Sequence, residues 1–86
     1  MPELCRFYGI VIRMYFNDHA PPHFHAFYGG DQAVFGIETL AVISGRLPPR
    51  AQGLVIEWAV QHQDELHDAW TRARRMESPG KIEPLD

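Results

Sequence analysis

With 86 residues, of which 45% are hydrophobic, the chain is long enough for one small globular domain with a modest core. Its formal net charge of −3 is spread over both halves, so charge does not support an RNA partner, although RNA stays open. The single cysteine, Cys5, excludes an internal disulfide, and no apolar run approaches the roughly 20 residues of a membrane span. We therefore expect a cytoplasmic protein that has no membrane partner.

The first predicted element is a strand over residues 7–16, where β-branched and aromatic side chains dominate. Alternation along a strand places Ile10 and Ile12 on an apolar face and Arg13 and Tyr15 on a mixed face. The two prolines that follow cannot continue the strand, because proline lacks the amide hydrogen that a sheet requires.

Residues 23–36 are predicted to form a hairpin around the two-residue turn Gly29-Gly30. This turn sets a register in which His23 faces Gly36, and opposed residues share a face of the sheet. The side chains then separate into a core face and a histidine face. The core face holds Phe24, Ala26, Ala33, Phe35 and Ile37, and the histidine face holds His23, His25, Phe27, Gln32, Val34 and Gly36.

A third partner strand is expected over residues 40–44, and a helical pattern begins at Pro49. The residues of one helix face, which is apolar except at His62, then recur every three or four residues, at Ala51, Val55, Trp58, His62, Leu66, Ala69 and Ala73. A single rod from Pro49 to Arg75 would be about 40 Å long at about 1.5 Å per residue, which is long for so small a domain. We therefore predict a break near residues 62–64, with Asp64 capping a second helix.

These patterns predict an α+β fold, in which an antiparallel sheet of three or four strands is covered on one face by a long or broken C-terminal helix. One domain spans residues 1–86, with the sheet at about 7–44, the helical part at about 49–76 and a docking tail at 77–86. Gly53 is a poor helix former, and we expect it to mark a close approach between helix and sheet.

Short motifs run through nearly the whole chain, at residues 6–16, 18–19, 21–25, 28–29, 37–40, 45–48, 57–59 and 81–85. In these motifs the chain resembles the bacterial family called domain of unknown function 4160. The resemblance implies a component of a toxin-antitoxin-like module of two genes, and hence a protein partner encoded by a neighbouring gene. The chain departs from the family pattern at Gly36, where relatives often have an acidic residue, so an acidic partner for His23 is expected to be missing.

Three of the five histidines lie close together in the chain, at His19, His23 and His25. On a strand, His23 and His25 leave the same face about 6.5–7 Å apart, a spacing that suits metal chelation. With His19 from the loop they would bind a Zn, Ni or Cu ion through three nitrogens and leave one position open. Glu38 and Glu57 are not expected at this site, because the helix should cover the core face. A metal-binding protein or a metal-dependent hydrolase is therefore one interpretation.

Two other interpretations compete with metal binding. In the first, His23 and His25 exchange protons without a metal while Arg13 holds a phosphodiester, as in a ribonuclease. In the second, the histidines together with Tyr15 and Phe27 form an exposed contact surface for a homodimer or a partner protein. The sequence leaves all three open.

Overall fold

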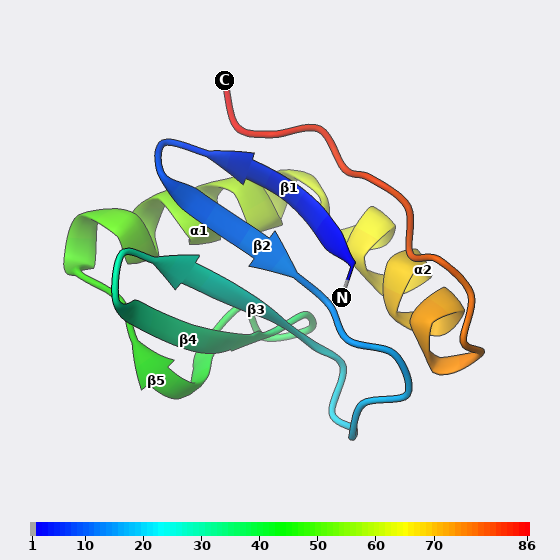
Figure 1. Ribbon diagram of the computed structural model, residues 1–86. Helices are drawn as coiled ribbons and strands as arrows, with labels where there is room; N and C mark the ends of the chain where they lie inside the picture. Colours follow the sequence, from blue (N-terminus) through cyan, green and yellow to red (C-terminus); the bar gives the residue numbers. More distant parts are fainter. Residues whose placement is uncertain (1) are drawn as a thin grey trace.

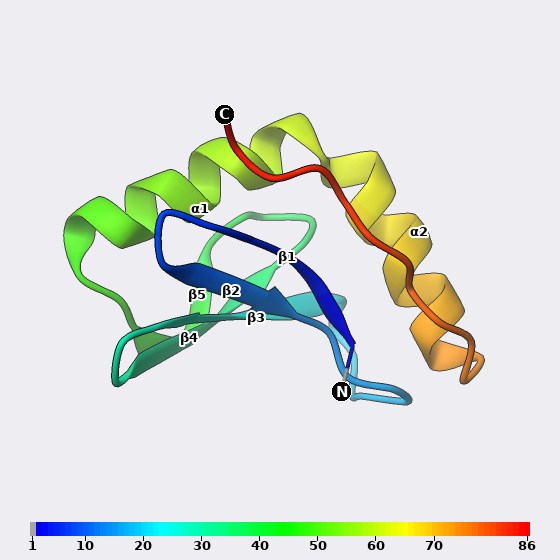
Figure 2. The same cartoon turned by 45° about the horizontal axis from the view of Figure 1, so that its top comes forward.

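The computed structural model describes residues 2–86, which form one antiparallel sheet and two helices (Figure 1). The strands follow chain order across the sheet: β1 (Glu3–Phe7), β2 (Ile10–Arg13), β3 (His23–Tyr28), β4 (Asp31–Gly36) and β5 (Val42–Arg46). The helices are α1 (Pro49–Gln61) and α2 (Gln63–Arg74), and Figure 2 shows α1 lying over one face of the sheet. The α+β class is confirmed, with five strands in place of the three or four predicted.

A tight turn at Tyr8 and Gly9 corrects the prediction of a single strand over residues 7–16. Phe7 pairs with Ile10 across the turn, and both turn residues have positive φ, 49° for Tyr8 and 81° for Gly9. A two-residue turn with positive φ fits the twist of a hairpin, and glycine adopts it without strain. The aromatic and β-branched neighbours of Gly9 hide this turn in the sequence, because tyrosine is uncommon at positive φ.

The β3–β4 hairpin has the predicted register. His23 pairs with Gly36, and the pairing continues without a shift to the turn at Gly29-Gly30. The core face is buried, and the rings of Phe24 and Phe35 stack there with 5.4 Å between their centroids. Since α1 lies over the core face, the histidine face is on the side of the sheet away from α1 (Figure 2).

The predicted break in the helical region is confirmed, because α1 ends at Gln61 and α2 begins at Gln63. His62 joins them with φ −125° and ψ 23°, a non-helical conformation, and Asp64 lies in the first turn of α2 without capping it. The close approach expected at Gly53 is wrong: Gly53 is exposed, and no heavy atom lies within 4 Å of an added Cβ. Neither helix in residues 2–86 is long and apolar enough to cross a membrane.

The segment after α2 runs back beside β1 (Figure 1). The amide of Ile82 donates to the carbonyl oxygen of Leu4 at 3.0 Å, and the side chain of Ile82 is buried. The indole Nε1–H of the fully buried Trp58 donates to the carbonyl oxygen of Glu83 at 2.8 Å. This segment therefore closes the core along the outer edge of β1.

Candidate functional site

The loop between β2 and β3, residues 14–22, positions the candidate site at the start of β3. Backbone hydrogen bonds fix this loop to two neighbouring elements. The amide of Asn17 donates to the carbonyl oxygen of Ala73 in α2 at 3.0 Å, and the amide of Ile37 donates to that of Pro22 at 3.0 Å. The path of the loop is thus set by α2 and by the end of β4.

Asp18 of this loop meets His23 and His25 of β3. The Oδ2 atom of Asp18 lies 2.9 Å from Nε2 of His23 and 3.4 Å from Nε2 of His25. One ligand atom from each residue lies within 4.8 Å of the other two, so the three side chains converge. His23 is buried, and Asp18 and His25 are half-buried. We call these three residues the Asp–His–His cluster.

Both ring nitrogens of His23 face an oxygen. Nδ1 lies 2.8 Å from the carbonyl oxygen of Pro21, which can only accept, so Nδ1–H is the donor. A ring with this single proton would present the lone pair of Nε2 to the carboxylate of Asp18 at 2.9 Å. Either a second proton or a cation must stand between these two atoms, because two acceptors cannot stabilise each other.

The protonation of the cluster follows from its burial and hydrogen bonds. Burial raises the pKa of the Asp18 carboxyl, but hydrogen bonds from the His19 amide, His23 and His25 outweigh this and hold the pKa below its usual value. Burial lowers the pKa of His25, because desolvation disfavours the charged ring, and the hydrogen bond with Asp18 opposes this only in part. Carboxylate and neutral imidazole, the forms that bind metal ions, are therefore favoured at Asp18 and His25 at neutral pH.

Aromatic rings enclose the two histidines. Tyr15 packs edge-on against His25 with 4.4 Å between ring centroids, and Trp70 of α2 packs against His23 at 5.0 Å. Phe27 stacks on His25 at 6.5 Å. Although α1 covers the core face, α2 therefore reaches the histidine end of the sheet through Trp70, and both imidazoles are held in place by packing.

Two arginines flank the cluster, and each lies over one of these aromatic rings. The guanidinium carbon of Arg13 is 5.1 Å from the ring centroid of Phe27, and that of Arg74 is 5.8 Å from Trp70. Arg13 is also the cross-strand neighbour of His25. Within the part of the chain that the structure describes, neither arginine forms an ion pair with a carboxylate. Both positive charges are therefore available to an anion.

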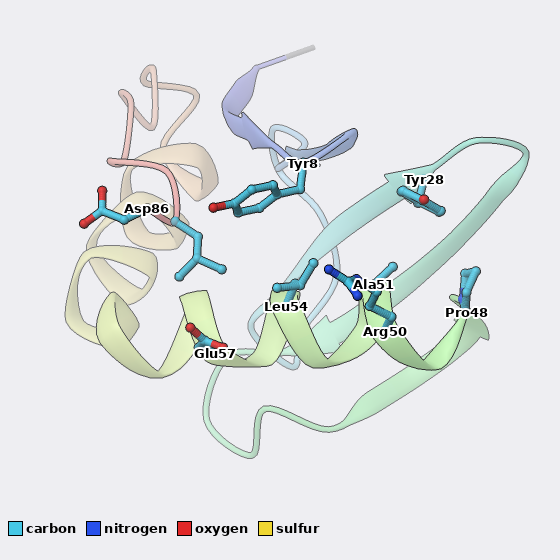
Figure 3. A pocket seen from close by; sticks show the side chains of 9 residues that line it. Tyr8, Tyr28, Pro48, Arg50, Ala51, Leu54, Glu57 and Asp86 are labelled. Atoms are coloured by element: carbon cyan, nitrogen blue, oxygen red, sulfur yellow. The ribbon is translucent and has the colours of Figure 1, made fainter.

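A hollow of about 480 Å³ lies at the other end of β3 and is shown in Figure 3. Tyr8, from the turn after β1, and Tyr28, the last residue of β3, line it together with Arg50 and Glu57 of α1. None of its described lining residues is a histidine or a cysteine. The converging carboxylate and imidazoles of the Asp–His–His cluster, at the opposite end of β3, make the cluster the candidate site.

A family model described as domain of unknown function, DUF4160, matches residues 9–71. The chain belongs to this family. The match agrees with the resemblance read from the sequence, and it includes Arg13 and the whole Asp–His–His cluster. No curated protein and no solved structure matches the chain. The description of DUF4160 names no activity, so we infer function from the cluster.

The DUF4160 fold brings together two of the three predicted metal ligands, His23 and His25. Arg13, predicted to hold an anion, lies on the same face as His25. His19 is exposed, and only its backbone contacts the cluster, where the amide donates to Oδ1 of Asp18 at 2.8 Å. Asp18, and not the predicted His19, is therefore the third candidate metal ligand beside His23 and His25.

Asp18 was not among the predicted site residues, and the expectation that His23 lacks an acidic partner is wrong. Gly36 does face His23 across β3 and β4, but the carboxylate comes from the loop. The available signal was an aspartate five residues before His23 in a loop that two prolines stiffen. Sequence patterns do not predict where a loop side chain points, so they could not identify Asp18 as the partner of His23.

Proposed function

We propose that this DUF4160 protein binds one divalent transition metal ion at Asp18, His23 and His25 and uses it for hydrolysis. Zinc is the first candidate, with nickel and copper as competitors. The observation that carries the proposal is the convergence of one carboxylate oxygen and two imidazole nitrogens within 4.8 Å. Two histidines and one carboxylate are a recurring ligand set of catalytic zinc sites.

The separations between the donor atoms fit a metal ion. With metal–ligand bonds of about 2.0–2.1 Å, neighbouring ligand atoms lie about 2.8–3.4 Å apart for angles between 90° and the tetrahedral value. The distances from Oδ2 of Asp18 to the two Nε2 atoms are 2.9 Å and 3.4 Å. The two separations that involve Asp18 therefore already fit a metal ion, and the third lies within 4.8 Å.

The hydrogen bond at Nδ1 of His23 favours metal over metal-free catalysis. Histidines that bind metals usually donate their other ring N–H to a carbonyl or carboxylate, as His23 does to Pro21. A metal ion at Nε2 would also remove the repulsion between this nitrogen and Asp18. In a metal-free ribonuclease, His23 would need a free ring nitrogen for proton transfer, and both of its nitrogens are engaged.

Three protein ligands leave at least one metal position open to water or substrate. A bound zinc ion lowers the pKa of its water to about 7, which supplies hydroxide at neutral pH. The half-buried position of Asp18 and His25 leaves this side of the cluster accessible. Hydrolysis of an ester or a related bond is the reaction class that such a site supports.

The test is elemental analysis of untagged protein purified without added metal or chelator. We expect about one zinc, nickel or copper ion per chain, and loss of most of it in Asp18→Asn and His25→Gln. His19→Gln is the matched control, because its backbone amide can still donate to Asp18, so its metal content should equal that of the wild type. A wild type without metal after reconstitution with each of the three ions, or full metal content in Asp18→Asn, would contradict the proposal.

A further inference from the structure

Arg13 and Arg74 relate to the Asp–His–His cluster in the same way. Arg13 lies over Phe27, which stacks on His25, and Arg74 lies over Trp70, which packs against His23. Each arginine is therefore one aromatic ring away from a different histidine of the cluster. The two positive charges come from different elements, β2 and the last turn of α2, and only the folded chain places both of them beside rings that pack on the cluster.

Two other arginines of the chain are paired with carboxylates, whereas Arg46, Arg50 and Arg75, like Arg13 and Arg74, form no ion pair among the described residues. Arg6 contacts Glu3 at 2.7 Å, and Arg72 contacts Asp68 at 3.0 Å. Beside the cluster, Asp18 is directed at the histidines, and Glu3, which lies opposite Arg13 across β1 and β2, pairs with Arg6 instead. The arrangement keeps two guanidinium groups available next to a site that a divalent ion would make still more positive.

We propose that Arg13 and Arg74 hold the phosphoryl group of a phosphate ester beside the metal ion at the Asp–His–His cluster. This inference rests on the proposed metal function and names its substrate class. The planar guanidinium matches the geometry of phosphate oxygens and binds them by two parallel hydrogen bonds. A divalent ion, one carboxylate and two arginines sum to a local charge of about +3, which suits an anion although the whole chain carries −3.

The reaction is hydrolysis of the ester. Hydroxide derived from water forms a new P–O bond, the P–O bond to the alcohol breaks, and the departing oxygen takes the remaining proton of that water. Phosphate ester and water thus give phosphate and alcohol, and no oxidant or other co-reactant is needed. The arginines would stabilise the charge on the phosphoryl oxygens, which is the usual protein contribution to phosphoryl transfer.

A phosphoryl group of this kind occurs in small phosphate esters and in single-stranded nucleic acid. The histidine face extends across the sheet from Phe27 through Gln32 to the exposed Arg46 of β5. A small ester would not reach Arg46, whereas the backbone of an oligonucleotide would. Substitution of Arg46 therefore separates the two sources.

The experiment uses zinc-loaded protein and three probes: inorganic phosphate by calorimetry, p-nitrophenyl phosphate by hydrolysis, and a fluorescein-labelled single-stranded oligonucleotide by anisotropy. Arg13→Gln and Arg74→Gln should each weaken phosphate binding by about tenfold or more, with unchanged zinc content. Arg50→Gln, at the hollow beyond the far end of β3, is the matched control and should bind phosphate as the wild type does. If Arg46→Gln weakens oligonucleotide binding and leaves phosphate binding unchanged, the phosphoryl group belongs to a nucleic acid.

The outcomes separate this inference from the metal proposal. Full zinc content with no phosphate binding, or with phosphate binding unchanged in Arg13→Gln and Arg74→Gln, would overturn the phosphoryl assignment and leave the metal site intact. A wild type that binds no zinc would overturn both. Hydrolysis of p-nitrophenyl phosphate without oligonucleotide binding would support a small ester.

Discussion

Oδ2 of Asp18 lies 2.9 Å from Nε2 of His23, on the side of the ring opposite the hydrogen bond from Nδ1 to the Pro21 carbonyl. Oδ1 of the same carboxylate accepts the amide hydrogen of His19 at 2.8 Å. One side chain thus connects the loop at residues 14–22 with the first residue of β3. The stability of this region should depend on which of these groups carry protons.

Acid should destabilise the metal-free protein in two steps. The unfolded chain protonates His25 near pH 6.5, whereas burial lowers the pKa of His25 in the folded chain. Below pH 6.5 the unfolded state therefore binds more protons, and the free energy of unfolding falls as the pH drops through the folded pKa. Asp18 adds a second decrease below about pH 4, because its folded pKa is also lowered.

Urea unfolding in EDTA at pH 7.5, 6.0, 5.0 and 4.0 measures the first of these decreases, that of His25. His25→Gln should remove much of the change between pH 7 and 5, because a neutral glutamine cannot titrate. His19→Gln serves as the control. Because His19 is exposed, this substitution should leave the dependence of the free energy of unfolding on pH unchanged. A free energy of unfolding that stays constant or rises between pH 7.5 and 5.0 would show that His25 is not desolvated as described.

The backbone at Gly45 should not tolerate a side chain. Gly45 has φ 74°, and an added Cβ would collide with the carbonyl oxygen of Gln32 on the paired strand β4. Left-handed backbone strain and overpacking together predict that Gly45→Ala lowers the free energy of unfolding by at least about 2 kcal/mol. Chemical denaturation compares this variant with the wild type.

Gly53→Ala is the matched control for Gly45→Ala. Gly53 lies inside α1, is exposed, and has nothing within 4 Å of an added Cβ. Since glycine is a poor helix former, Gly53→Ala should raise the free energy of unfolding by about 0.5–1 kcal/mol. Equal effects of the two substitutions would contradict the strained, crowded backbone at Gly45.

The sequence predicted those parts of the fold that local patterns determine. Gly29-Gly30 between two alternating strands was sufficient for the β3–β4 register, and a register fixes which side chains share a face. The turn at Tyr8-Gly9 was missed, because a tyrosine at positive φ is indistinguishable from a strand residue in a run of aromatic and β-branched side chains. That error joined β1 and β2 into one strand.

The candidate site was predicted only in part for a similar reason. The two-residue period of a strand places His23 and His25 side by side, so their pairing could be derived. The position of Asp18 depends on a hydrogen bond between Asn17 and Ala73, which are 56 residues apart in the chain and share no sequence pattern. The toxin-antitoxin-like role and the partner from a neighbouring gene stay predictions, since they concern a second molecule.

Cys5 should be protected from thiol reagents in the folded protein. Its side chain is buried in the core, and burial, aided by the nearby Glu3, raises the pKa of the thiol to about 12. The thiolate is the reactive form, so at pH 8 labelling should require unfolding and run at least about 1,000-fold slower than in 6 M urea. Above about pH 9 the unfolded chain loses the thiol proton first, so stability should also fall. Rapid labelling of the folded chain at pH 8 would contradict this burial.

The segment after α2 should contribute to the stability of the core through Ile82. This side chain is 5% exposed, and the backbone amide of Ile82 donates to the carbonyl oxygen of Leu4 in β1. Ile82→Ala removes buried apolar atoms and should lower the free energy of unfolding by about 2 kcal/mol, at the low end for such a change because a terminal segment can readjust. Glu83→Ala is the control: Trp58 donates to the backbone carbonyl of Glu83, which the substitution keeps, so urea unfolding should change by less than about 0.5 kcal/mol. If both variants are as stable as the wild type, this segment is not docked on β1.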